Sequence, residues 1–166
     1  MTIPNPLLHN EPTGTMTWAL TIRVYSEPTA MRAVRKLVNS AAQMVGASEQ
    51  DAYDLEVAVG EAVTNAYLHA YGGKTQGEID VDLGYNGKDF LASVHDGGKP
   101  VTDQITVPQN PPERGHGCGL YLIGQLMDEV QIVQPDRGGR GVAVQMSKKI
   151  RRNHHTPTRS PLTPNG

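Results

Sequence analysis

The chain has 166 residues, one cysteine and a formal net charge of −2, and 37% of its residues are hydrophobic. Such a length suits a single domain with a normal core. The slightly acidic balance lacks the signature of a nucleic-acid-binding protein, so no direct nucleic-acid partner is expected. No apolar run reaches the roughly 18 residues that a membrane-spanning helix needs, and no secretory signal pattern is present. With no intrachain disulfide available, we expect a cytoplasmic protein without membrane contact.

The two ends of the chain differ in composition from its middle. Residues 1–15 contain three prolines and no periodic pattern, and residues 151–166 contain three more prolines. The C-terminal stretch is also basic, beginning with Lys148 and Lys149, which suits either a solvated end or a docking segment. We predict a flexible arm over 1–15, a folded domain over 16–150 and a flexible basic tail over 151–166.

Hydrophobic periodicity and turn residues predict five strands and three helices in the folded part. The first predicted elements are a strand over 17–24, a helix from Pro28 to a stop at Gly46, and a helix from an N-cap at Ser48 to a stop at Gly72-Gly73. Two strands over 79–83 and 90–94 follow, joined by a turn at Asn86-Gly87, and then a flexible loop over 101–114. The last elements are a helix over 119–127 and strands over 129–133 and 142–146, joined by a turn at 136–139. Such an order favours an α+β fold. We predict a two-layer sandwich in which helices cover one face of a mixed, mostly antiparallel sheet.

The first candidate site lies on the second predicted helix. Glu61 and Asn65 are four residues apart, so their side chains lie one above the other on one face. A carboxamide oxygen suits Mg²⁺, which prefers hard oxygen ligands. A carboxylate one turn earlier can accept a proton from an attacking hydroxyl or water. A polar stripe that only faces solvent would show the same spacing.

The second candidate follows the predicted strand over 90–94. Asp96 precedes Gly97-Gly98, and glycines at the end of a strand allow backbone and ligand to approach closely. A buried carboxylate there can accept a hydrogen bond from an exocyclic amino group such as that of adenine. An aspartate that only forms the turn would fit the same residues.

The third candidate is a glycine-rich loop before the third predicted helix. Gly115, Gly117 and Gly119 alternate, and Leu120 follows them. Small residues leave backbone N–H groups free to face a ligand, and the N-terminus of a helix favours phosphate. Arg114 is either a partner for phosphate or an ordinary surface arginine. The loop lacks the ending of a P-loop and does not sit in the βαβ unit of a Rossmann site.

The histidines and the single cysteine add no metal site, because they lack ligand spacing. His69 lies four residues after Asn65 on the same helix face, which suits either the edge of a phosphate site or a structural role. Cys118, inside the glycine loop, suits either a small filler residue or a slow redox-active thiol.

Three segments stand in a fixed order along the chain: residues 55–71 (LEVAVGEAVTNAYLHAY), 94–100 (VHDGGKP) and 114–130 (RGHGCGLYLIGQLMDEV). They resemble the N-box, the G1 box and the G2 box of the histidine-kinase-like ATPases of the GHKL superfamily, and within them the bacterial anti-sigma-factor serine kinases. The resemblance covers roughly residues 17–150. It implies the histidine-kinase-like ATPase fold, ATP and Mg²⁺ as cofactors, and a serine/threonine protein kinase activity.

The resemblance also implies roles for individual residues. Glu61 would be the base that activates the acceptor hydroxyl, and Asn65 would coordinate Mg²⁺. Asp96 would bind the adenine amino group, and the loop over 101–114 would be part of a nucleotide lid. The implied cofactor-binding set is Asn65, Asp96, Gly98, Arg114, Gly115, Gly117, Gly119 and Leu120.

In that family, the kinase phosphorylates a serine or threonine of an anti-anti-sigma protein and alternatively holds a sigma factor, commonly as a dimer. The resemblance therefore implies these two partners and a homodimer. One position departs from the family pattern. The last box usually has Gly-Thr, whose threonine supports adenine contacts through water, whereas here Gly141 is followed by Val142, which cannot make that bond.

We therefore expect an ATP-dependent serine/threonine kinase that acts as an anti-sigma factor. The alternative is an ATP-binding regulatory module that binds its partners with little or no phosphotransfer, and Val142 motivates it. A third class, a histidine-kinase catalytic domain detached from its sensor, is disfavoured because no phospho-accepting histidine helix is apparent. All three share the nucleotide site and differ in their partner.

Overall fold

The computed structural model describes residues 16–74, 76–99, 103–113, 117–134 and 140–151. The predicted arm over 1–15, nearly all of the predicted tail over 151–166 and the predicted turn at 136–139 lie outside these residues. In chain order the elements are β1 (Trp18–Tyr25), α1 (Pro28–Met44), α2 (Glu49–Asn65), the π-helical segment η2 (Ala66–Ala70), β2 (Glu78–Tyr85), β3 (Asp89–Asp96), α3 (Cys118–Leu126), β4 (Glu129–Val133) and β5 (Ala143–Lys149).

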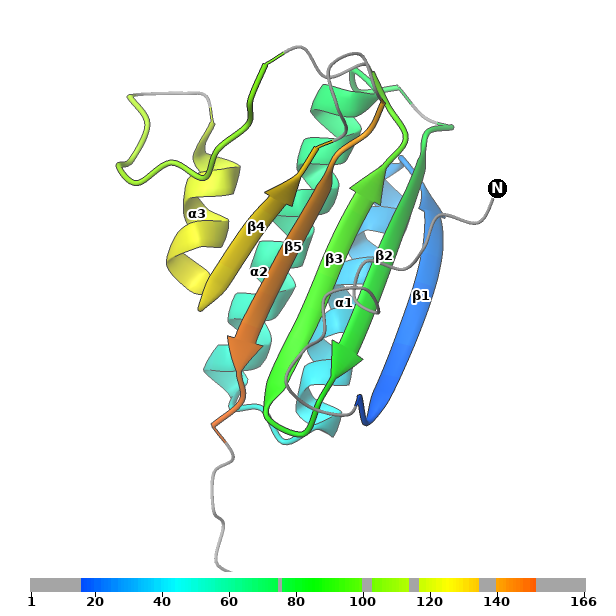
Figure 1. The fold of residues 1–166 in the computed structure, drawn as a ribbon. Helices are drawn as coiled ribbons and strands as arrows, with labels where there is room; N and C mark the ends of the chain where they lie inside the picture. The colour runs from blue at the N-terminus through cyan, green and yellow to red at the C-terminus, as the bar shows by residue number, and fades with distance from the viewer. Residues whose placement is uncertain (1–15, 75, 100–102, 114–116, 135–139, 152–166) are drawn as a thin grey trace, which may run out of the picture.

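The fold is a two-layer sandwich, as predicted. α1 and α2 lie side by side on one face of the five-stranded sheet, and α3 lies beside α2 near the β4 edge (Figure 1). The strand order is β1-β2-β3-β5-β4, and every pair of neighbouring described strands is antiparallel. The expected mixed sheet is thus antiparallel throughout its described pairs. The crossover through α3 makes β3 and β4 run in the same direction, but β5 lies between them.

The core lies between α2 and the inner face of the sheet. On β2, the side chains of Ile79, Val81 and Leu83 are completely buried, as the strict alternation of this strand predicts. On α2, Leu55 and Val59 are equally buried. Burying a side chain of this size stabilises the folded state by about 1.5–3 kcal/mol. Because its apolar residues are held against the sheet, the rotation of α2 is fixed, and only the residues on its other faces can contribute to a site.

Both ends of α2 follow from specific residues. The Ser48 hydroxyl accepts a hydrogen bond from the Asp51 N–H at 3.0 Å, so Ser48 is the N-cap that the sequence predicts. At the other end the α-helix stops at Asn65 and continues as the single π-helical turn η2. Gly72 and Gly73, with φ angles of 63° and 72°, then end the helix, because these left-handed conformations favour glycine.

The helix α3 begins earlier than predicted. Its first residue is Cys118, and its N-cap is Gly117, whose φ angle of 88° is left-handed. Gly119 therefore lies in the first turn of α3 instead of in the loop before it. Residues 103–113, the described part of the predicted loop over 101–114, contain no helix or strand. No helix among the described residues is long and apolar enough to cross a membrane.

Lys148 is part of the folded domain and not of a free basic end. Its Nζ lies 3.1 Å from Asp54 Oδ2 and 3.8 Å from Asp51 Oδ1, and it donates a hydrogen bond to the Leu126 carbonyl at 2.8 Å. The side chains of Lys148 and Asp54 are each only 12% exposed. One ammonium group thus joins β5, the start of α2 and the end of α3. Lys149, the next residue, is exposed.

We predict that Lys148→Met destabilises the protein by about 3 kcal/mol, because it leaves the nearly buried carboxylate of Asp54 without its cation. The free energy of unfolding in urea measures the effect. Lys149→Met is the matched control, and as an exposed change it should stay within about 0.5 kcal/mol of the parent. Equal effects of the two substitutions would show that the Lys148 ion pairs contribute nothing specific.

Candidate functional site

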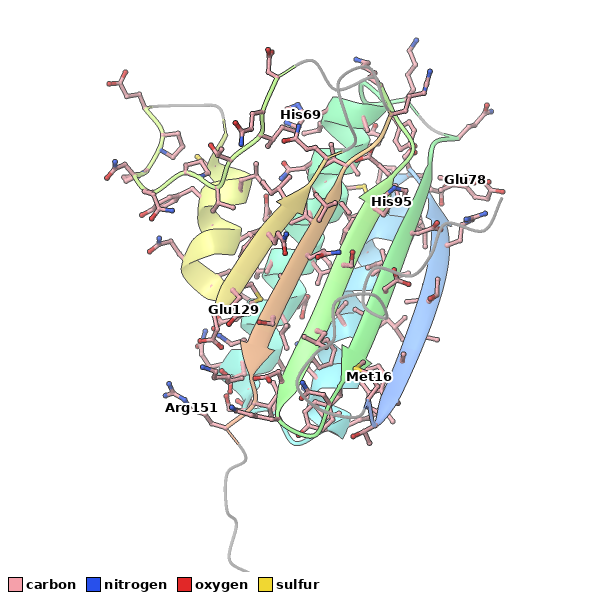
Figure 2. The ribbon with its side chains drawn as sticks, viewed as in Figure 1. Met16, His69, Glu78, His95, Glu129 and Arg151 are labelled. Carbon is pink, nitrogen blue, oxygen red and sulfur yellow. The ribbon has the colours of Figure 1, made fainter. Side chains whose placement is uncertain are left out.

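A cavity of about 550 Å³ lies where the C-terminal end of α2, η2 and the start of α3 meet one end of the sheet. Figure 2 shows His69 of η2 at the same end of the sheet as His95, the residue before Asp96. The cavity combines an apolar floor from inner-face strand positions with polar groups on its walls. It is lined by Ala62, Asn65, Ala66, His69, Ala70, Val94, Asp96, Lys99, Asp103, Ile105, Gly117, Leu120, Ile132, Val142 and Val144.

Asn65 places its carboxamide in this cavity. Its Nδ2 atom is buried and has no hydrogen-bond partner among the described residues. An unsatisfied buried amide costs about 1–3 kcal/mol, so this group is free to bind a ligand that supplies the missing bond. The same side chain occupies the last position of α2, where the regular α-helix gives way to η2.

Glu61 lies one turn before Asn65 and adjoins the cavity. A Cβ atom added to Gly119 would lie 3.0 Å from Asn65 Oδ1 and 3.1 Å from Glu61 Oε2. Both functional side chains therefore lie directly against the first turn of α3, in space that a side chain at Gly119 would fill. The other Glu61 oxygen, Oε1, lies 3.7 Å from Arg35 Nη2 of α1. Glu61 thus lies against Gly119 with one oxygen and near a cation with the other.

Asp96 ends β3 at the opposite wall and is only 8% exposed. Its Oδ1 accepts a hydrogen bond from the Gly98 N–H at 3.0 Å, and its own N–H donates to the Val142 carbonyl at 3.1 Å. Burial raises the pKa of the Asp96 carboxyl above its usual value, although the hydrogen bond from Gly98 opposes this. A carboxylate held in this way can accept a hydrogen bond from a ligand amino group.

Two glycines allow the Asp96 turn to pack closely. A Cβ atom on Gly98 would lie 2.7 Å from Ala70 Cα and 2.8 Å from the Ala70 carbonyl oxygen, so the two backbones touch. Gly141 has a φ angle of 85°, and a Cβ there would overlap the Asp96 carbonyl. Both positions therefore require glycine for space, and Gly141 also requires it for its backbone conformation.

The structure gathers most of the predicted site residues at this cavity. Asn65, Asp96, Gly117 and Leu120 line it. Gly98 and Gly119 contact residues that line it, and Glu61 lies beside Gly119. Arg114 and Gly115 lie outside the described residues. Val142 is one of the cavity-lining residues, so the departure from the family pattern falls inside the site.

Other lining residues were not singled out from the sequence. Val94, Ile132 and Val144 occupy inner-face positions, and their strand alternation marks them as core residues without showing that they form a cavity floor. Lys99 stands within the predicted turn, directly after Gly97-Gly98. Asp103 and Ile105 come from the loop that the family resemblance assigns to the nucleotide lid, but its lack of periodicity did not mark these two residues individually.

Known proteins resemble this chain over most of its length. A family model described as a histidine kinase-like ATPase domain matches residues 24–148. The chain belongs to the histidine kinase-like ATPase family. It is 34% identical over 138 residues to the serine-protein kinase RsbW of Oceanobacillus iheyensis, across 78% of this chain and 85% of that protein. The RsbW of Bacillus subtilis is 30% identical over 138 residues, across 78% of this chain and 84% of that protein.

A solved structure supports the same fold. The crystal structure of the RsbU and RsbW domains of a Mycobacterium tuberculosis protein matches with a TM-score of 0.60 and 25% identity, over 81% of this chain and 33% of that chain. Membership in this ATPase family implies that the domain binds ATP. The observed fold, with helices on one face of an antiparallel sheet, agrees with that membership.

The residues present also fit a magnesium ion that accompanies ATP. Asn65 offers its carboxamide oxygen Oδ1, which faces the space that the missing side chain of Gly119 leaves open. Among the described residues, no group of three or more His, Cys, Asp or Glu side chains is placed to hold a metal ion. A single protein oxygen is compatible with Mg²⁺, which usually keeps several waters and takes substrate phosphates as ligands.

We predict that Asp96→Asn stabilises the folded protein at neutral pH. Burial raises the Asp96 pKa in the folded state, because it penalises the charged carboxylate. The folded protein therefore keeps its full stability at low pH, where Asp96 is protonated, and loses some of it as the pH rises through the raised pKa. Asparagine keeps an oxygen for the Gly98 N–H and has no such loss. Melting temperatures at about pH 7.5 and about pH 4.5 should show a gain at the higher pH that shrinks at the lower one.

Asp80→Asn on β2 is the matched control with the opposite sign. The hydrogen bond from Arg23, at 2.7 Å, lowers the pKa of the Asp80 carboxyl. Its contribution is therefore present at neutral pH and is lost as the pH falls through the lowered pKa. Asp80→Asn should lower the melting temperature slightly at neutral pH, since the Arg23 side chain is mostly exposed. A loss at neutral pH for Asp96→Asn would contradict the assigned burial effect.

Proposed function

We propose that this chain is an ATP-dependent serine/threonine protein kinase that acts as an anti-sigma factor. It phosphorylates an anti-anti-sigma protein on a serine or threonine and alternatively sequesters a sigma factor. The protein works in the cytoplasm as a homodimer, without binding nucleic acid or a membrane. One observation carries the kinase assignment: a carboxylate and a carboxamide, Glu61 and Asn65, meet against Gly119 in the first turn of α3. The identity to serine-protein kinases named RsbW supports the choice of partner class.

The residues divide the work of phosphotransfer between them. Glu61 accepts the proton of the substrate hydroxyl while the hydroxyl oxygen forms a bond to the γ-phosphorus of ATP. At the same time the bond between the γ-phosphorus and the β-phosphate oxygen breaks, and ADP leaves. Asn65 holds Mg²⁺, which supplies charge neutralisation for the phosphates when bound. Gly115, Gly117 and Gly119 leave backbone N–H groups available for the phosphates, and Arg114 adds a positive charge. The reaction needs mainly positioning and electrostatic stabilisation.

The end of the cavity near Asp96 recognises the adenine ring of ATP. Asp96 accepts a hydrogen bond from the adenine amino group, and Gly98, which has no side chain to clash with Ala70, lets the Asp96 turn lie against η2. Val94, Ile132 and Val144 provide an apolar floor on which a purine ring packs. The loop 101–114, whose residues Asp103 and Ile105 line the cavity, covers the nucleotide as part of the lid. Asp96→Asn should therefore weaken ATP binding while it stabilises the free protein.

We predict that Glu61→Gln lowers the rate of phosphotransfer by roughly 100- to 10,000-fold, because the amide cannot accept the hydroxyl proton. The purified protein is incubated with Mg-ATP and an anti-anti-sigma protein, and phosphate incorporation is followed over time. ATP affinity, measured by calorimetry, should change little. Glu56→Gln on the same helix is the matched control, since Glu56 accepts a hydrogen bond from Asn39 away from the cavity. Transfer at the parental rate in Glu61→Gln would refute this base assignment.

One residue, Val142, favours a second function, that of an ATP-binding regulatory module. Val142 lines the cavity at the position where the family pattern has a threonine, so the chain lacks one hydroxyl near the adenine base. An ATP-binding regulatory module would hold its partners by surface contacts with little or no phosphotransfer. Tight ATP binding without phosphorylation of any anti-anti-sigma protein would favour this module over the kinase, whereas stoichiometric phosphorylation would exclude it.

We predict that Val142→Thr tightens ATP binding by about fivefold, the change that corresponds to one added hydrogen bond. The fold should tolerate the substitution, because the interaction that Val142 makes with Asp96 uses its backbone carbonyl. Calorimetric titration with ATP gives the dissociation constant. Val133→Thr, an exposed position on β4, is the control and should leave it unchanged. Equal affinities for Val142→Thr and the parent would show that the missing hydroxyl does not limit binding.

A further inference from the structure

Tyr71 links three separate parts of the fold through one hydroxyl group. The Tyr71 hydroxyl donates a hydrogen bond to the Glu78 carbonyl, and it accepts one from the Gly97 N–H at 3.0 Å. Glu78 is the first residue of β2 and lies at the same end of the sheet as His95 (Figure 2). Gly97 directly follows Asp96 at the end of β3. The hydroxyl therefore joins the end of the helical layer to β2 and to the turn that carries Asp96.

The π-helical turn sets where Tyr71 lies. The Tyr71 N–H donates to the Ala66 carbonyl at 3.3 Å, five residues back, which is the hydrogen bond of a π-helix. The following Gly73 N–H bonds to the Tyr67 carbonyl at 2.9 Å. Single π-turns inside helices occur often at functional sites. Here the turn brings the residues after Asn65 against the Asp96 turn.

Two further contacts support the same junction. The backbones of Ala70 and Gly98 touch, with no room for a Cβ atom on Gly98. The Tyr71 ring covers Gly77, where an added Cβ atom would overlap the ring. Tyr71 itself is not among the described residues that line the cavity. It therefore acts on the site only through the turn that it holds.

We propose that Tyr71 is a positioning residue for the nucleotide: its hydroxyl fixes the turn Asp96–Gly98 so that the Asp96 carboxylate faces the adenine amino group. This inference rests on the proposed function of the cavity as an ATP site. The geometry supplies the reason, since Asp96 Oδ1 is already held by the Gly98 N–H and the intervening Gly97 N–H is held by Tyr71. Without the hydroxyl, only the Gly98 side of the turn remains tied to the helical layer.

The protonation state of Tyr71 agrees with its two bonds. Burial raises the pKa of the Tyr71 phenol above its usual value, and the hydrogen bond from Gly97 opposes this. The hydroxyl consequently keeps its proton at neutral pH and donates it to the Glu78 carbonyl while it accepts from Gly97.

We predict that Tyr71→Phe weakens ATP binding about fivefold in calorimetric titration, because the ring stays in place over Gly77 while both hydrogen bonds are lost. Phosphotransfer at saturating ATP should remain near the parental rate, since Glu61 and Asn65 are unchanged. Tyr85→Phe is the matched control. It also removes a tyrosine hydroxyl that donates to a backbone carbonyl, that of Gly87, but at the opposite end of β2. Its ATP affinity should equal that of the parent.

A second measurement uses the free protein and needs no nucleotide. Gly97 is exposed, yet its amide should be protected from hydrogen exchange because the Tyr71 hydroxyl accepts from it. Protection at Gly97 should disappear in Tyr71→Phe and persist in Tyr85→Phe. This readout separates a local effect on the turn from a general loss of stability, which would raise exchange in both variants.

The outcomes distinguish the inference from the proposed function. A Gly97 amide that exchanges freely in the parent protein overturns the inference, whatever the variants do. So does an ATP affinity in Tyr71→Phe that equals the parental value. If the parent binds no ATP at all, the proposed function fails, and lost protection of Gly97 in Tyr71→Phe would then support only the hold on the turn.

Discussion

The packing of α2 on the inner face of the sheet is the constraint on which the site depends. Leu55, Val59 and Val63 are completely buried in this contact, so the position and rotation of the helix are fixed. The two candidate polar residues, Glu61 and Asn65, lie on the part of α2 that meets the first turn of α3. The chemistry therefore sits on a rigid element, and its geometry follows from core packing instead of from loop conformation.

The two walls of the cavity are built in different ways. The wall near α3 is formed by side chains that meet a glycine, whereas the wall near β3 is formed by backbone contacts of Gly98 and Gly141 with their neighbours. Each wall holds a polar group that costs folding free energy. The Asn65 amide nitrogen has no hydrogen-bond partner among the described residues, and burial raises the pKa of the Asp96 carboxyl. Such local costs, in an otherwise well-packed fold, are typical of functional sites.

Local signals in the sequence predicted the elements well because each rests on nearby residues. Ser48 caps α2, and the Asn86 side chain accepts from the Asp89 N–H at 2.7 Å within the hairpin turn. Glu61, Asn65 and Asp96 could be proposed as a site for the same reason. The π-turn η2 was not predicted, because Ala66–Ala70 contains no glycine or proline that would mark a change of helix type. The burial of Lys148 escaped as well, since its partners on α2 lie almost a hundred residues away in the chain and only the fold brings them together.

The absence of side chains at Gly98 and Gly141 has a consequence for chemical biology. Enlarged ATP analogues are commonly matched to a kinase by trimming a bulky residue beside the base. Here the two positions closest to the Asp96 turn have nothing left to trim, and their backbones already touch Ala70 and Asp96. In the proposed ATP site, room for a bulkier purine has to come from the apolar floor, where shortening Ile132 or Val144 would open space without disturbing the glycines. A variant of this domain that accepts an enlarged ATP analogue should therefore carry its substitutions on the strands that form the cavity floor.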